Sequence, residues 1–232
     1  MMRAAVFALT VVAALNGADY KDVNKTVPMN PNGSVTVENH KGSIQITTWD
    51  RAEVDIKARI ESEPGAPMNR RRFDATEVVI DSSADAVRIR TQYPDSCCFN
   101  DDGNNPEVRY TIRMPRTGQL TIHDHRSETE IAGLAGALHM DTHRGTVRVH
   151  FAAFTGNSSV ETHRGSVELS LPRNSRFDVQ ADMGRHATFD TDFAMMTRSA
   201  GRRDEMVHGS INGGGPVLRL TTHRGNIRIH AE

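Results

Sequence analysis

Histidine is the residue type with the greatest chemical potential in this 232-residue chain, and four histidines share a repeated setting. His123 and His125 form an H-x-H pair, while His143 and His163 each lie in the phrase T-H-R-G. In an alternating strand these side chains point away from the aliphatic face. Neutral imidazole binds zinc, copper and nickel, so the four histidines predict a divalent transition-metal site. The alternative, which we favour, is a ladder of turn residues that cap backbone groups and recur because the unit was duplicated.

Carboxylates share the predicted outward face with these histidines. The alternation places Asp141 beside His143 and Glu161 beside His163. If the histidines stack, mutual repulsion between their protonated forms should lower their pKa values, and these carboxylates should oppose that change. Asp141, Glu161 and the outward Arg148 are also candidates for the site of a carbohydrate-active enzyme.

Catalytic signatures are otherwise scarce. The sequence has no G-x-S-x-G elbow, no H-E-x-x-H, no phosphate-binding glycine loop and no C-x-x-C. Trp49 is the single tryptophan and there are three tyrosines, so aromatic platforms for sugars are few. We therefore expect no enzymatic activity and no cofactor. The formal net charge of -1 argues against a nucleic-acid partner.

The two cysteines, Cys97 and Cys98, are adjacent in a turn-rich stretch. Neighbouring cysteines can close only a small, strained disulfide ring, and strained disulfides are readily reduced. We favour a disulfide that only fixes the loop and has no redox role, and a regulatory disulfide is the alternative.

A repeated phrase organises the second half of the chain. It occupies residues 138–151, 160–171 and 218–231, and places His143, His163 and His223 at intervals of 20 and 60, which equal one and three periods. Degenerate copies fill the intervals and precede them, at residues 120–131, 179–193 and 206–214, with an early copy at 35–47. Such a period is typical of a repeat architecture.

Each copy predicts a strand, a turn and a second strand. Apolar residues alternate with polar ones on both sides of a corner, as in a half-buried strand. A glycine occupies each corner, where the backbone needs a positive φ, and we assign these residues a structural turn role: Gly42, Gly145, Gly165 and Gly225.

Two all-β architectures can be built from this unit. If the two strands of a copy pair with each other, the product is a β-sandwich of hairpins. If each strand pairs with its equivalent one period away, the chain coils into a β-solenoid with repeats of about 20 residues. We predict the solenoid, because stacking requires a nearly constant period and hairpins do not.

The N-terminal region predicts export. Residues 1–18 contain one positive charge, a short apolar run and then small residues, which is the order found in a signal peptide. The run is too short to span a bilayer, so the mature chain should not be membrane-spanning. The rest, 19–232, is predicted to be one domain with an irregular part, 19–106, and a regular repeat part, 107–232.

The segment at 108–122, VRYTIRMPRTGQLTI, and the following G-[SVTN]-[VI]-x-[VIL] corners resemble a family of exported bacterial proteins classed as candidate adhesins. This resemblance covers most of residues 24–232. It implies a right-handed β-solenoid related to the head domains of surface adhesins. We accordingly expect an exported, non-catalytic adhesin-like binding or scaffold protein of the cell envelope. Its location would be the periplasm or the cell surface, and its partner an unknown envelope or surface ligand.

Overall fold

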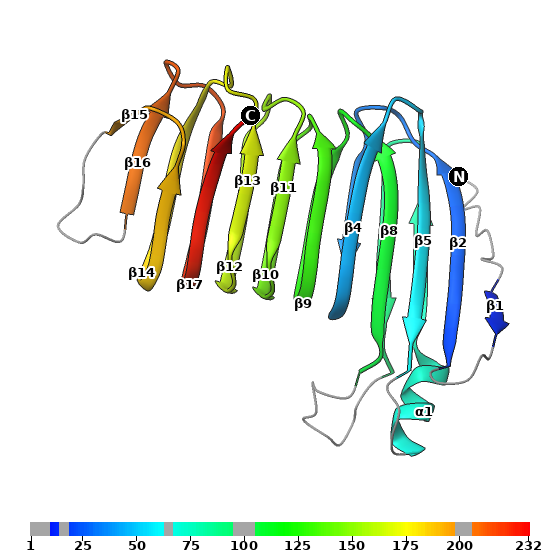
Figure 1. Ribbon diagram of the computed structural model, residues 1–232. Coiled ribbons are helices and arrows are strands. Elements are labelled where there is room, and N and C mark those ends of the chain that lie inside the picture. The colour runs from blue at the N-terminus through cyan, green and yellow to red at the C-terminus, as the bar shows by residue number, and fades with distance from the viewer. Residues whose placement is uncertain (1–9, 14–18, 63–66, 95–104, 198–205) are drawn as a thin grey trace.

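The computed structural model describes residues 10–13, 19–62, 67–94, 105–197 and 206–232. This part of the chain consists almost entirely of strands that are hydrogen-bonded into one continuous system (Figure 1). The all-β class predicted from the sequence is therefore confirmed.

The elements follow one another along the chain in this order. They are β1 (Thr10–Ala13), β2 (Tyr20–Pro28), β3 (Ser34–Glu38), β4 (Lys41–Trp49), β5 (Glu53–Glu61), α1 (Pro67–Ala75), β6 (Glu77–Ser82), β7 (Ala86–Gln92), β8 (Glu107–Pro115), β9 (Gln119–Leu134), β10 (Leu138–Arg144), β11 (Val147–Phe151), β12 (Ser158–Arg164), β13 (Val167–Leu171), β14 (Phe177–Thr191), β15 (Met195–Thr197), β16 (Met206–Ile211) and β17 (Val217–Ala231).

Strands of the repeat pair in parallel with their equivalents in neighbouring copies. β10 lies between β9 and β12, and β11 lies between the second half of β9 and β13. The register is kept: Met140 pairs with Val160, and Val147 pairs with Val167. The pairing thus runs between copies, as the constant period predicted, and we use the word coil for one strand–corner–strand copy of the stack.

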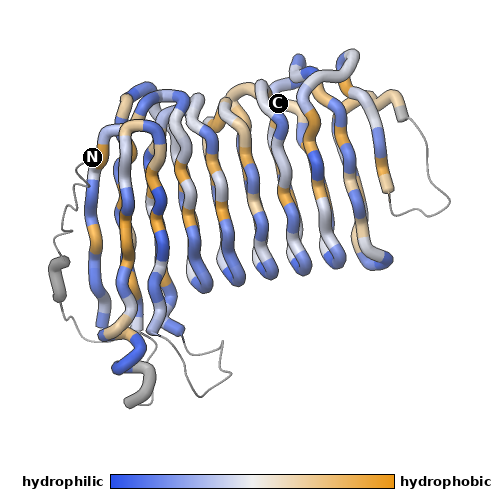
Figure 2. Tube along the Cα trace, turned by 180° about the vertical axis from the view of Figure 1, so that it is seen from behind, coloured by the Kyte–Doolittle hydropathy of each residue, from blue (hydrophilic) through white to orange (hydrophobic). Residues whose placement is uncertain are grey.

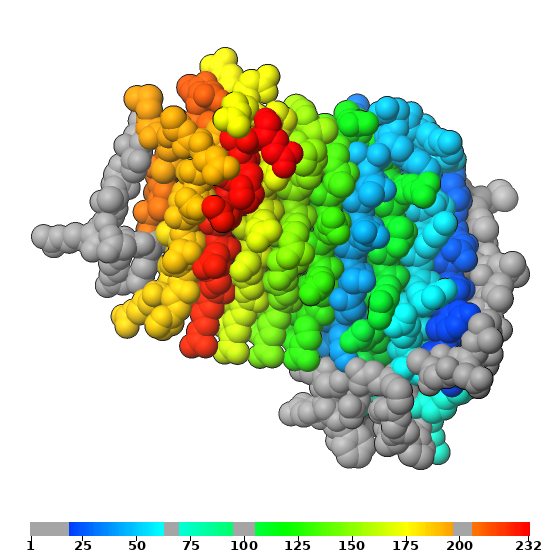
Figure 3. Space-filling view, in the orientation of Figure 1, coloured from blue at the N-terminus to red at the C-terminus, as the bar shows by residue number. Residues whose placement is uncertain are grey.

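Two copies occupy places that their position in the sequence does not indicate. The early copy, β3 and β4, pairs with β9. The last copy, β17, lies between β12 and β13 on one side and β14 on the other. In Figure 3 the red residues of β17 form a stripe between the yellow-green of β13 and the yellow of β14.

Although 60 residues of sequence separate His163 from His223, the two residues belong to adjacent coils. A difference between the corners explains this order of the coils. β14 changes register between Met183 and His186 where it meets β17, so its corner does not match the T-H-R-G corner. The well-preserved copies stack on one another, and β14 follows at the outside. The segment 206–214 is also not a parallel copy, since its strand β16 pairs antiparallel with β14.

The ends of the stack are antiparallel. β5 lies between β2 and β8, and β6 pairs with β7. Helix α1 begins at Pro67 and ends at Ala75. No helix in the described residues is long and apolar enough to cross a membrane.

Inward side chains form aliphatic ladders between the sheets. Val149 is 2% exposed, and Leu169 and Ile229, which follow it in the stack, are fully buried. Figure 2 shows the result as hydrophobic and hydrophilic segments alternating along each strand. Burial of these apolar side chains is the main stabilising contribution, at roughly 1.5–3 kcal/mol for each fully buried aliphatic residue.

Close stacking of the coils explains the corner glycines. Gly145 has a φ of +140°, and a β-carbon there would overlap the carbonyl oxygen of Ser127 in the neighbouring coil. Gly225 has a φ of +134° and stands in the same relation to Gly165. Glycine is needed at these corners both for its backbone conformation and for lack of space.

Two predicted features lie mostly or wholly outside the described residues. The signal peptide, 1–18, is described only at Thr10–Ala13, which forms β1 and pairs antiparallel with β2. Cys97 and Cys98, with the disulfide considered for them, fall in the segment that is not described.

Candidate functional site

The corners of five successive coils bring five histidines into one row. The distances between neighbouring ring centroids are 4.6, 4.8, 4.8 and 5.0 Å along the series His40, His125, His143, His163 and His223. The first three rings lie parallel, with interplanar angles of 1° and 3°, and the remaining rings are tilted. We call this series the histidine row. It runs along the stacking direction, past the hydrophilic turns that Figure 2 shows along one edge of the molecule.

Strand register produces this row. Parallel neighbours lie about 4.8 Å apart, so a residue type kept at the same place in each coil must repeat at that spacing. Arg126, Arg144, Arg164 and Arg224 are aligned by the same register, each immediately after a histidine of the row. We call these four residues the arginine row.

The pKa values of His143 and His163 are lowered. The largest cause is partial loss of hydration, followed by the positive charge of neighbouring histidines and of the arginine row. The direction agrees with the expectation from mutual repulsion, but repulsion is the second cause. Asp141 and Glu161, which were expected to oppose it, line a groove elsewhere on the surface.

A carboxyl group lies behind the histidine row. Asp124 accepts hydrogen bonds from the hydroxyl groups of Ser127, at 2.5 Å, and Thr142, at 3.1 Å. Burial nevertheless dominates and raises the pKa of Asp124 to about 6. Ser127 also accepts a hydrogen bond from the side chain of Asn39, so the interior of the corner is a small polar network.

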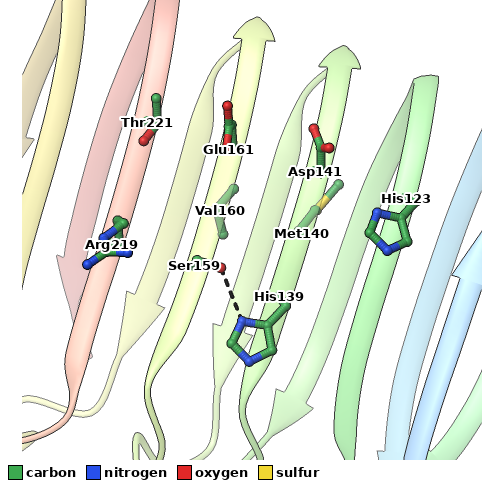
Figure 4. A pocket seen from close by; sticks show the side chains of 9 residues that line it. All are labelled: His123, His139, Met140, Asp141, Ser159, Val160, Glu161, Arg219 and Thr221. Carbon is green, nitrogen blue, oxygen red and sulfur yellow. Dashed lines mark hydrogen bonds between the residues drawn. The ribbon is translucent and has the colours of Figure 1, made fainter.

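The outer face of β9, β10, β12 and β17 bears a shallow groove of about 190 Å³ (Figure 4). Its lining residues are His123, His139, Met140, Asp141, Ser159, Val160, Glu161, Arg219 and Thr221. The His139 ring and the Ser159 hydroxyl lie 3.1 Å apart and share a hydrogen bond. The groove can offer hydrogen bonds and charges of both signs to a ligand that lies across the strands.

The four histidines predicted as metal ligands do not form one set. His125, His143 and His163 lie together in the histidine row, whereas His123 lines the groove. Within the described ranges, no cluster of three or more His, Cys, Asp or Glu residues is arranged to hold a metal ion. The metal site stays a prediction, as does the enzyme site at Asp141, Glu161 and Arg148.

Sequence reasoning did not nominate His40 or His223 for this site. His40 could have been found, because the early copy ENHKG matches THRG when the histidines are aligned. Nothing in the sequence indicates that His223 lies directly beside His163, since 60 residues separate them. Only the three-dimensional order of the coils makes the row continuous.

Of three solved structures compared with this chain, the first shares its fold. A candidate cell adhesion protein from Clostridium sporogenes has a TM-score of 0.53 at 11% identity, over 90% of this chain and 99% of that one. A candidate adhesin from Bacteroides fragilis gives a TM-score of 0.32 at 9% identity, over 91% and 97% of the two chains. A candidate lipid-binding protein from Parabacteroides distasonis gives 0.26 at 10% identity, over 89% and 96%.

A search of curated proteins finds no match to this chain. The model of one protein family, however, matches residues 26–230, which is most of the sequence. This match confirms the family resemblance drawn from the corner motifs. The chain belongs to the Toastrack DUF4097 family.

Proposed function

We propose that this protein is an exported, non-catalytic binding protein of the bacterial cell envelope, with an adhesin-like role. The observation that carries the proposal is the row of equivalent corners, which presents the same polar groups once per coil along the stack. Such an array suits an extended ligand that has its own repeat. A catalytic site needs instead one set of unlike groups that converge on a reacting atom.

Other features support the same role. The groove on the face of β9, β10, β12 and β17 is shallow, and it is lined mainly by outward residues of these strands. Among the described residues no aromatic side chain besides histidine is found in its lining, although aromatic platforms usually hold sugar rings in carbohydrate-active enzymes. The names of the related structures refer to adhesion or binding.

We further propose that the stack is a right-handed β-solenoid. In-register parallel pairing between copies supports the coil, and a right-handed connection between parallel strands is the general rule. Both faces would then remain available along the full length of the stack.

Two measurements test the proposed function. N-terminal sequencing of the protein from the envelope fraction should begin near residue 19. The purified chain should also sediment with washed bacterial envelopes in a saturable manner, and unlabelled protein should compete with labelled protein. An intact Met1 on protein confined to the cytosol would contradict export. Binding that does not saturate would contradict the binding role.

A further inference from the structure

The arginine row differs from the other outward arginines of the molecule. Within the described ranges, no carboxylate forms a salt bridge with Arg126, Arg144, Arg164 or Arg224. Asp124 and Glu128, which lie two residues before and after Arg126, form none with them either. In addition, the buried Nε of Arg144 has no hydrogen-bond partner. Four guanidinium groups therefore repeat along one edge without an ion-pair partner among the described residues.

Several arginines on the flat faces are paired with carboxylates of a neighbouring strand. Arg148 lies 3.2 Å from Glu168, and Arg228 lies 3.3 Å from Asp190. The same pattern recurs at the other end of the stack, where Arg109 lies 2.9 Å from Glu61. These face arginines thus have carboxylate partners, whereas the four arginines of the corner edge do not.

Such accumulation opposes folding. Like charges placed directly opposite one another on neighbouring strands are destabilising. His143 and His163 lie along the same edge, and their lowered pKa values favour neutral imidazole, so these rings add hydrogen-bonding nitrogens rather than negative charge. A chain that brings one negative group to each coil would relieve this repulsion along the whole edge.

We propose that the arginine row and the histidine row together bind an extended acidic polysaccharide, a polyuronate, which lies along the stacking direction with about one carboxylate per coil. The proposal rests on the binding role proposed above and names its ligand class. Guanidinium groups bind carboxylates with paired hydrogen bonds, and imidazole nitrogens can exchange hydrogen bonds with sugar hydroxyls.

Spacing favours a polyuronate over other polyanions. The coils lie about 4.8 Å apart, which is close to the length of one sugar residue in an extended chain. Duplex DNA carries one negative charge per ~1.7 Å, so most of its phosphates would find no partner on a single row. The phosphates of polyphosphate are also more closely spaced than the coils. A chain of carboxylated sugars matches the row coil by coil.

Calorimetry with polygalacturonate oligomers of increasing length tests this assignment at low salt. Wild type should bind saturably, with affinity that rises up to about four or five sugars, since four coils carry an arginine and five carry a histidine of the two rows. The double variant Arg144→Gln with Arg164→Gln should weaken binding at least tenfold and reduce its salt dependence. The matched control, Arg148→Gln with Arg228→Gln, removes the same charge from the faces and should bind as wild type does. Circular dichroism and thermal melting verify that all three proteins are folded.

Several outcomes would overturn the assignment. They are absence of saturable binding by wild type, equal weakening in both double variants, equal binding of neutral dextran, and tighter binding of polyphosphate or single-stranded DNA. The envelope assay separates this failure from failure of the proposed function. If envelopes still bind the protein while polygalacturonate does not, the ligand class alone is wrong. If neither binds, the binding role itself is wrong.

Discussion

The glycine of each corner lies against the carbonyl group of the next coil, so the addition of one carbon atom tests how tightly the coils stack. In Gly145→Ala the new methyl group would overlap the carbonyl oxygen of Ser127, and the φ of +140° would be strained. We expect a loss of about 3 kcal/mol or more in the free energy of unfolding, measured with urea. Gly156→Ala is the control, because the nearest atoms to its methyl group would belong to Ala137, with the closest approach 3.3 Å to that residue's side chain. A loss at Gly145 as small as that at Gly156 would contradict the close approach.

The raised pKa of Asp124 predicts how the free energy of unfolding depends on pH. Its pKa is about 6 in the folded protein, against 3.8 for an ordinary carboxyl group, so the folded state holds a proton more tightly than the unfolded state. The free energy of unfolding should therefore fall as pH rises from about 4 to 6, by up to ~3 kcal/mol at ~1.36 kcal/mol per pH unit. Asp124→Asn should be more stable than wild type at pH 8 and nearly equal to it at pH 4. The exposed Asp141→Asn should show no such difference, and a gain for Asp124→Asn that is independent of pH would contradict this explanation.

At the scale of the strand, the alternation of apolar and polar residues places one set of side chains in the core and the other on the surface. Val149→Asp places a carboxylate among buried aliphatic side chains and should lower the free energy of unfolding by several kcal/mol. Arg148→Asp, one residue away, loses an exposed ion pair to Glu168 and should cost about 1 kcal/mol. Thermal melting of both variants measures the difference. Similar losses would mean that the inward and outward assignments are wrong.

The sequence allowed these assignments because period-two alternation is a local signal. Val147, Val149, Val167 and Leu169 were predicted to face inward, and all four are buried. Parallel pairing of equivalent copies was also predictable, since the constant period fixes the register. Asp124 escaped prediction because burial of a polar residue inside a corner depends on the path of the backbone there. An outward alternation pattern does not reveal it.

At the scale of the whole molecule, the order of the coils was beyond sequence reasoning. The repeat spacing indicates that two copies are alike, but it does not indicate which copies are neighbours in the stack. β17 leaves β16 and inserts between β12 and β14, which precede it by tens of residues. Matching of the T-H-R-G corners favours this place, whereas the corner of β14, with its shifted register, fits only at the outside. The continuous histidine and arginine rows depend on this insertion.

The central position of β17 predicts that damage to it spreads in both directions. Leu220 is fully buried and pairs with Val160 on one side and Ala181 on the other. In Leu220→Asp, hydrogen exchange measured by mass spectrometry should therefore accelerate in both β12 and β14, because each loses its partner strand when β17 opens. Ile211→Asp is the matched control: Ile211 is equally buried, but its strand β16 pairs with β14 and β15 only among the described strands. Its effect should stay within β14–β16 and leave β12 protected. If Leu220→Asp left the protection of β12 unchanged, β17 would not lie between these two coils, and the row that joins His163 to His223 would be broken there.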